Sequence, residues 1–249
     1  GRTAHRSPSG FISPSRCCGR QVTAVRFTAD VCTLPHQGSG NSPVRFELNI
    51  DYPVEKIAQN RRRMEARQRF AYVDRVPVGF CLVPRYFAPI FGVPYRELFR
   101  DAETQYYWQL QFAKYRIENI PEDSFCTGPA IGVAPYFDNV IESSAFGAEI
   151  IYPENETIFS RPTIRTVDEM DRFVPPEPDA GLWGTVCRWR EEMLEFAKET
   201  RITFNGVEGR VSVGGLGLSG IGPHMIAIDL VGESFYAWML ECPERCHVF

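Results

Sequence analysis

The chain has 249 residues, of which 44% are hydrophobic, 13% aromatic and 23% charged, and its formal net charge is −4. This composition excludes a disordered or fibrous protein, and the negative charge excludes a general attraction for the phosphates of nucleic acid or membranes. No apolar run approaches the roughly 18 residues that cross a bilayer, and no basic start leads into an apolar signal core, so we expect a cytoplasmic protein.

Residues 1–43 differ in composition from the rest of the chain. They contain five arginines, a single acidic residue and many Ser, Pro and Gly, and they show no helical or strand period. An Arg-rich, acid-poor segment is also typical of a transit peptide. We interpret residues 1–43 as a disordered or non-native extension and expect the native protein to begin near Val44.

Regular patterns begin after residue 43. Asp51 is positioned to cap a first helix, with Pro53 in its first turn, and the basic run 61–63 is expected to be a solvated helix face. Thr166 and Glu169 form the sequence pattern of a capping box. The expected strands are residues 75–83, 130–137, 148–153 and 209–217. The expected helices are residues 93–120, 139–147, 166–173 and 182–200, with further helices after a glycine-rich turn at 218–223.

Strands alternating with helices predict parallel strands covered by helices, either in an open sheet or in a (β/α)8 barrel. Only about four or five such units fit after residue 75, whereas a barrel of roughly 250 residues needs eight. We therefore predict an α/β fold over residues 44–249, a partial (β/α)8 TIM barrel whose C-terminal strands are missing from this chain. Ligand-handling residues are expected at the carboxyl ends of its strands, where Asp138 and Arg85 lie.

Asp138 ends the apolar run "AIGVAPYF", where a carboxylate loses water and needs a compensating partner. It either caps the helix expected from Asn139 or faces a ligand. Tyr86 and Tyr136 are most simply read as packing residues beside strands. His224 is a proton donor, a metal ligand or, by our preferred interpretation, a hydrogen-bonded structural histidine.

Eight cysteines occur without a C-x-x-C pair, which together with the lack of a secretion signal indicates reduced thiols. The nearest approach to a metal motif is "CPERCH", with Cys242, Cys246 and His247. No second ligand pair follows it, so we interpret these cysteines as small residues of a buried helix.

Four segments carry a resemblance to a known family: "DRVPV", "YFDNVIESSAFGAEI", "RPTIRTVDEMDRFVPPEPD" and "GIGPHMIAIDLVGESFYAWMLECPERCHVF". In this order they resemble the uroporphyrinogen decarboxylase superfamily, which also contains corrinoid-linked methyltransferases. The resemblance covers about residues 44–249 and implies a TIM-barrel domain.

The family's F-S-D-I segment is matched here by Phe137 and Asp138 in "YFDN". The resemblance implies that Asp138 is catalytic, accepting hydrogen bonds from the pyrrole N–H groups of a substrate, and that Phe137 contributes to substrate binding.

The second half of the family's R-Q-A-G-R-Y motif is matched by Arg85 and Tyr86 in "CLVPRYFAP". Both are therefore expected to bind substrate, with Arg85 engaging a carboxylate. Cys81 replaces the first arginine of the motif and Pro84 replaces its glycine, which weakens the case for uroporphyrinogen itself as substrate.

The main function implied is decarboxylation of a tetrapyrrole acetate without a cofactor, with Asp138 stabilising a protonated pyrrole. The first alternative is methyl transfer between a corrinoid protein and a small thiol or amine-derived acceptor, with zinc ligands beyond Phe249. The second is a divergent small-molecule-binding member without tetrapyrrole chemistry. The expected partners are a small-molecule substrate and a second copy in a homodimer, without nucleic acid or membrane.

Overall fold

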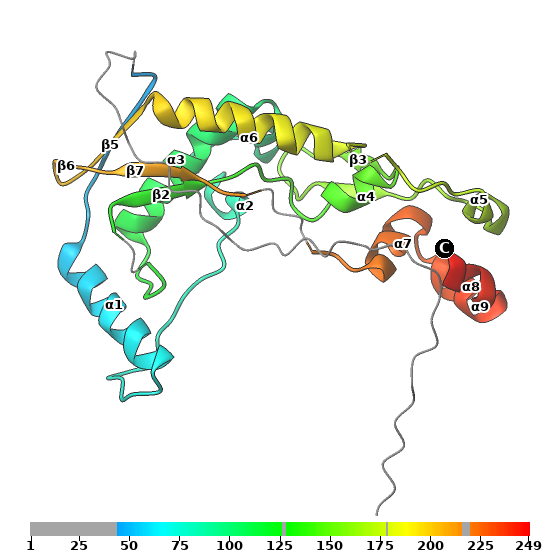
Figure 1. Ribbon diagram of the computed structural model, residues 1–249, viewed down its shortest axis with the longest axis horizontal. Coiled ribbons are helices and arrows are strands. Elements are labelled where there is room, and N and C mark those ends of the chain that lie inside the picture. Colours follow the sequence, from blue (N-terminus) through cyan, green and yellow to red (C-terminus); the bar gives the residue numbers. More distant parts are fainter. Residues whose placement is uncertain (1–43, 126–127, 178, 216–219) are drawn as a thin grey trace, which may run out of the picture. The chain divides into compact units, whose positions relative to one another are not determined.

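The computed structural model describes residues 44–125, 128–177, 179–215 and 220–249, and the expected extension at 1–43 lies outside them (Figure 1). The strands are β1 (Phe46–Ile50), β2 (Ala130–Val133), β3 (Glu149–Ile151), β4 (Phe159–Arg161), β5 (Thr200–Phe204), β6 (Val207–Glu208) and β7 (Arg210–Val213). The α-helices are α1 (Val54–Gln68), α2 (Pro84–Phe87), α3 (Ala102–Asn119), α4 (Ile141–Ala145), α5 (Val167–Asp171), α6 (Leu182–Lys198), α7 (Pro223–Val231), α8 (Ser234–Glu241) and α9 (Pro243–Val248), and η1 (Tyr95–Phe99) is a 3₁₀ helix.

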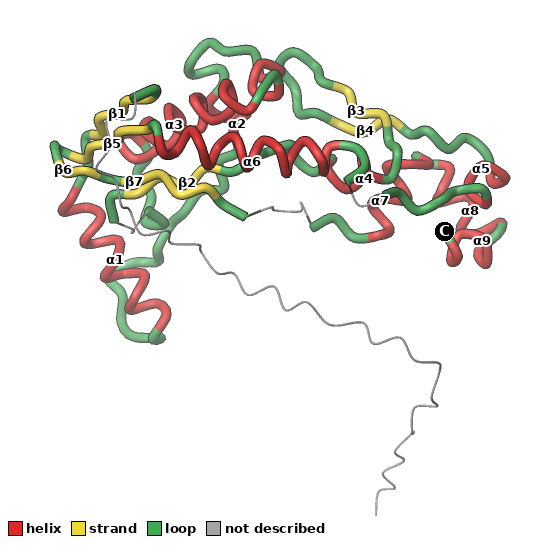
Figure 2. The backbone as a smooth tube through the Cα atoms, turned by 45° about the horizontal axis from the view of Figure 1, so that its top comes forward, coloured by secondary structure: helices red, strands yellow, loops and turns green. Residues whose placement is uncertain are grey.

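Two strand pairs of the described residues, each side by side in Figure 2, are parallel, as the alternation of strands and helices predicts. β1 pairs with β5 and β2 pairs with β7. β6 extends the first pair as a hairpin with β5. β3, which lies within the strand predicted at 148–153, pairs with β4 in antiparallel fashion, so the prediction of parallel strands is wrong for this segment. The protein is thus mixed α/β with small sheets. The described strands form no closed barrel, and a partial barrel stays a prediction.

The main hydrophobic core lies between these parallel strands and the two long helices. Ile50 of β1 and Ile202 of β5 are buried in one cluster with Tyr106 of α3 and Met193 of α6. α3 and α6 pack directly against one another. Apolar side chains recur on one side of α6, and burial of that side removes its apolar surface from water. α3 contributes Tyr106 to this core and Phe112 to a separate apolar cluster.

Several expected elements are confirmed. α6 matches the helix predicted at 182–200, and α3 with η1 accounts for the helix predicted at 93–120. The capping box is present, because the Thr166 side chain accepts from the Glu169 N–H and the Glu169 side chain accepts from the Thr166 N–H. The predicted cap by Asp51 is wrong: α1 follows Pro53 and has no side-chain cap.

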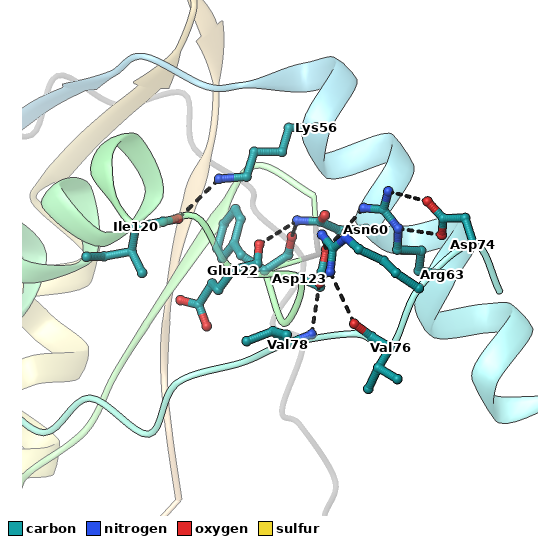
Figure 3. Close-up of polar contacts among 11 residues, drawn as sticks. Lys56, Asn60, Arg63, Asp74, Val76, Val78, Ile120, Glu122 and Asp123 are labelled. Atoms are coloured by element: carbon teal, nitrogen blue, oxygen red, sulfur yellow. Dashed lines mark hydrogen bonds and ion pairs between the residues drawn. The ribbon is translucent and has the colours of Figure 1, made fainter.

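The predicted strand at 75–83 is also wrong. The segment is extended but pairs with no strand of the described residues, and Val76 is 78% exposed. Its backbone is held by the side chain and the backbone of Asp123 (Figure 3). The Asp123 carboxylate accepts the Val78 N–H at 2.9 Å, and the Asp123 N–H donates to the Val78 carbonyl oxygen at 2.6 Å. The apolar pattern that resembles a buried strand therefore lies on the surface.

Asp123 is the centre of this cluster. Its side chain is only 2% exposed and accepts from Arg75 at 2.8 Å and from Arg63 of α1 at 3.2 Å. Arg63 also binds Asp74, so one member of the basic run 61–63 is an ion-pairing residue rather than part of a solvated face. Burial raises the pKa of Asp123, but the Arg75 hydrogen bond, the Val78 N–H and the two guanidinium charges outweigh it and hold that pKa below its usual value.

Glu122 extends the cluster toward α3. Its buried carboxylate accepts from Arg116 and Ser124 and from the N–H of Phe80. Burial raises the pKa of Glu122, and these hydrogen bonds lower it by more, so the net direction is down. Two adjacent buried carboxylates thus tie residues 75–80 to α1 and α3.

A second apolar cluster is built from the C-terminal helices. Met170 of α5, Leu230 of α7 and Phe235 of α8 are buried in it. None of the helices in the described part of the chain combines the length and apolar character needed to cross a membrane.

Candidate functional site

Asp138 lies five residues after the last residue of β2, beyond the carboxyl end of a parallel strand. Its φ angle is 46°, in the left-handed region that few residues other than glycine adopt. Such a backbone costs on the order of 1 kcal/mol and persists where the surrounding structure enforces it. The strain directs attention to what the Asp138 side chain does.

Two tyrosine hydroxyls donate to the Asp138 carboxylate. The Tyr95 Oη lies 3.0 Å from Oδ1 and 3.1 Å from Oδ2, and the Tyr136 Oη lies 2.6 Å from Oδ1. α4 begins at Ile141, and its N-cap residue Val140 provides no side-chain cap. The carboxylate is therefore not used to cap this helix, which was the competing interpretation of Asp138.

Neighbouring elements hold the two tyrosines in place. Tyr95 belongs to η1 and is 1% exposed. The backbone of Tyr136 is bound by the side-chain amide of Gln105 on α3, which accepts from the Tyr136 N–H and donates to its carbonyl oxygen, both at 2.8 Å. Gln109, one turn later, binds the N–H and the carbonyl oxygen of Ala134 in the same way. α3 thereby fixes the segment between β2 and Asp138.

Both tyrosines keep their protons at neutral pH. Burial and then the Asp138 charge raise the pKa of Tyr95, while burial and then the hydrogen bond to Asp138 raise the pKa of Tyr136. The Cys81 thiol adds a smaller upward effect on Tyr136. No basic side chain of the described residues forms an ion pair with Asp138. The site is thus a carboxylate with two neutral donors.

The structure does not bring Arg85 into contact with Asp138. The Arg85 guanidinium, 46% exposed, forms an ion pair with Glu156 at 3.0 Å. Tyr86, its neighbour, is half-exposed and packs edge-on against Phe87. The substrate-binding roles of Arg85 and Tyr86 stay predictions.

Phe137 points into the main core. It is 2% exposed, and its ring centroid lies 4.8 Å from that of Trp189 and 5.9 Å from that of Phe99. Because its ring is buried in the core, Phe137 is suited to anchor the backbone of Asp138, and its substrate-binding role stays a prediction.

Within the described ranges, no group of three or more His, Cys, Asp or Glu side chains is arranged to hold a metal ion. Zinc therefore has no set of ligands among these residues, and the zinc prediction stays untested. Cys242 and Cys246 are free thiols, partly rather than fully buried, on and beside α9.

Tyr95 is the functional candidate that sequence reasoning missed. It lies 43 residues before Asp138, in a segment without a recognisable motif. Gln105 and Gln109 did carry a signal: two amides four residues apart on the apolar side of a helix need polar partners. Tyr136 was interpreted as packing, whereas its hydroxyl is a donor to Asp138.

Comparison with known proteins assigns no family. No protein-family model and no curated protein matches the chain. A solved structure of a methyltransferase from Methanosarcina mazei is similar to 75% of this chain, with 19% sequence identity and a TM-score of 0.43. The chain spans 50% of the length of that methyltransferase chain. A likeness at this level defines neither a family nor an activity.

Proposed function

We propose that this chain is part of an enzyme of the uroporphyrinogen decarboxylase-like superfamily and that its reaction is methyl transfer to a small thiol or amine-derived acceptor. The proposal combines the sequence resemblance over residues 44–249 with one observation: the Asp138 carboxylate is bound by two tyrosine hydroxyls and is not used as a helix cap. A carboxylate held in this way, five residues beyond the carboxyl end of a parallel strand, is suited to orient a polar hydrogen of a ligand.

The number of free acceptor positions favours a small acceptor over a tetrapyrrole. An ionised carboxylate offers about four acceptor positions. Tyr95 and Tyr136 already direct their hydroxyls at both oxygens of Asp138. The positions left suit one or two donors better than the convergent N–H groups of a tetrapyrrole.

The charges near the site support the same choice. A tetrapyrrole with acidic side chains needs cationic partners for its carboxylates. Arg85 is instead engaged by Glu156, and Cys81 stands where the family motif has its first arginine. Decarboxylation therefore becomes the second candidate, supported by the same Asp138.

In the proposed reaction a methylated corrinoid donor supplies the methyl group. The acceptor's lone pair forms the new bond to the methyl carbon, while the bond to the donor breaks and its electron pair stays with the donor. The acceptor's proton passes to the Asp138 carboxylate or to solvent. Tyr95 and Tyr136, whose own pKa values are raised, keep this carboxylate oriented without giving up their protons.

The experiment compares both reactions on the whole protein of which this chain is proposed to be part. We expect methylcobalamin to lose its methyl group in the presence of a thiol or amine acceptor, and the methylated acceptor to appear in equal amount. We expect no carbon dioxide from uroporphyrinogen.

Asp74→Asn provides the matched control for the substitution Asp138→Asn, because Asp74 is a surface carboxylate paired with Arg63 in the cluster of Figure 3. It should react at the wild-type rate. Carbon dioxide release from uroporphyrinogen by the wild type would reverse the choice between the two reactions, and no transfer to any acceptor would contradict methyl transfer.

A further inference from the structure

The C-terminal helices line a half-open cavity that the proposed function does not use. Its volume is about 590 Å³, within the range of roughly 300–1,000 Å³ that is typical of small-molecule sites. Its walls come from α7, α8 and α9, from Phe146 just after α4 and from Phe173 just after α5. None of the residues argued above for the Asp138 site lines it.

Aromatic rings form much of this wall. Phe146 stacks on Phe173 with ring centroids 6.0 Å apart, and Phe249 contacts both Phe173 and Phe235, at 5.2 and 6.3 Å. An aromatic ring that packs against another ring gains more free energy than burial of the same apolar area alone would give. The wall is therefore suited to a flat aromatic ligand.

Two imidazoles interrupt the apolar wall. His224 lies in the first turn of α7 and His247 on α9, and both line the cavity. Neither ring has a hydrogen-bond partner among the described residues, so the expected hydrogen bond of a structural His224 is not found there. The ring of His224 lies 5.9 Å from Phe235. Each imidazole has an N–H available for an acceptor group of a ligand.

From this cavity we infer a second binding site, for a small aromatic molecule that carries an acceptor group such as a carboxylate or a sulfonate. Its rings would lie against Phe146, Phe173, Phe235 and Phe249, and its acceptor group would face His224 and His247. The inference rests on the cavity and its lining alone and stands whether or not the proposed methyl transfer is found.

Two fluorescent probes test the two halves of this inference. 8-Anilinonaphthalene-1-sulfonate has an aromatic body and an acceptor group, whereas N-phenyl-1-naphthylamine has the same rings without the sulfonate. We expect saturable binding of the sulfonate at one site per chain, at least threefold tighter than binding of the amine. In His224→Leu that difference should shrink. Equal affinity of the two probes in the wild type would overturn the acceptor assignment.

Two methionine substitutions locate the site. Met239 lines the cavity, whereas Met225 on α7 is 48% exposed and does not. Met239→Trp should fill the space and weaken binding of the sulfonate at least tenfold, and Met225→Trp should leave it unchanged. Equal binding in the two variants, or no saturable binding to the wild type, would overturn the inference. If Met239→Trp loses its helical circular dichroism, Cys246→Trp, at a partly buried position of α9 that lines the cavity, takes its place with the same criterion.

Discussion

At the scale of the residue, Asp138 combines a left-handed backbone with a carboxylate that receives two buried or half-buried hydroxyls. Neither feature serves the start of α4, whose first turn lacks a side-chain cap. A strained residue that is held by its surroundings is a frequent property of functional sites. We take this combination as the reason to place function at Asp138.

Tyr95→Phe tests how firmly the carboxylate is held. Removing the buried hydroxyl deprives Asp138 of one donor, so the free energy of unfolding should fall by about 1.5 kcal/mol, as for a hydrogen bond to a charged group. Urea denaturation measures this change. Tyr86→Phe is the matched control, because Tyr86 is half-exposed, and it should change stability little. Equal losses in the two variants would show that the Tyr95 hydroxyl is not an important partner.

Sequence alone could predict a strand before Asp138, because an apolar run followed by a carboxylate is a local pattern. The strand predicted at 130–137 is nevertheless too long, since β2 ends at Val133. It could not choose between a helix cap and a ligand contact, since that choice depends on Tyr95, which is distant in the chain. The same limit applies to Arg85: the motif around it is local, but its partner Glu156 lies 71 residues away.

At the scale of the element, the extended segment 75–80 is held by two buried carboxylates instead of by a neighbouring strand. Asp123→Asn should lower the free energy of unfolding by about 2 kcal/mol, because two guanidinium groups lose the charge that they bind. Urea denaturation is again the measurement. Asp74→Asn, which removes an exposed partner of Arg63, should change stability much less. Similar effects of the two variants would contradict the central role of Asp123.

The hairpin between β5 and β6 gives a second prediction at this scale. Its two-residue turn is Asn205–Gly206, with φ angles of 51° and 79°, the pairing that suits a tight hairpin. Gly206→Ala should destabilise the protein by about 1 kcal/mol, because alanine is strained at a positive φ. Gly215, which has open space around it and no positive φ, provides the control. No difference between the two alanine variants in thermal unfolding would contradict this reading of the turn.

Elements with local signals could be predicted, and the others could not. The capping box of α5 and the amphipathic pattern of α6 depend only on residues that are close together in the sequence. Strands β1 and β5 were missed, although Asn205–Gly206 is a hairpin signal beside β5. The segment 75–83 was wrongly predicted to be a strand. An apolar run in the sequence does not show whether its backbone is bound by a neighbouring strand or by side chains.

At the scale of the whole molecule, stability should depend on pH through Asp101, Glu122 and Asp123. Burial raises the pKa of each, and hydrogen bonds and charges lower it by more, so all three pKa values lie below the usual 3.8 for Asp and 4.5 for Glu. The unfolded chain therefore takes up protons first as the pH falls. The urea midpoint should stay level from pH 7 to about 5.5 and decline below about pH 4.5. A rise in the midpoint on acidification would contradict this assignment.

The central claim for the molecule is that the Asp138 carboxylate serves a ligand rather than the fold. The most direct test is Asp138→Asn, because asparagine also tolerates the left-handed backbone and keeps one oxygen for the tyrosine hydroxyls. We predict that acceptor methylation falls about 100-fold, a magnitude typical of a lost proton-accepting group, while the urea midpoint shows a stability change below about 1 kcal/mol. Methylation at the wild-type rate in Asp138→Asn would contradict the claim. So would a loss of activity no larger than the fraction of the variant that is unfolded.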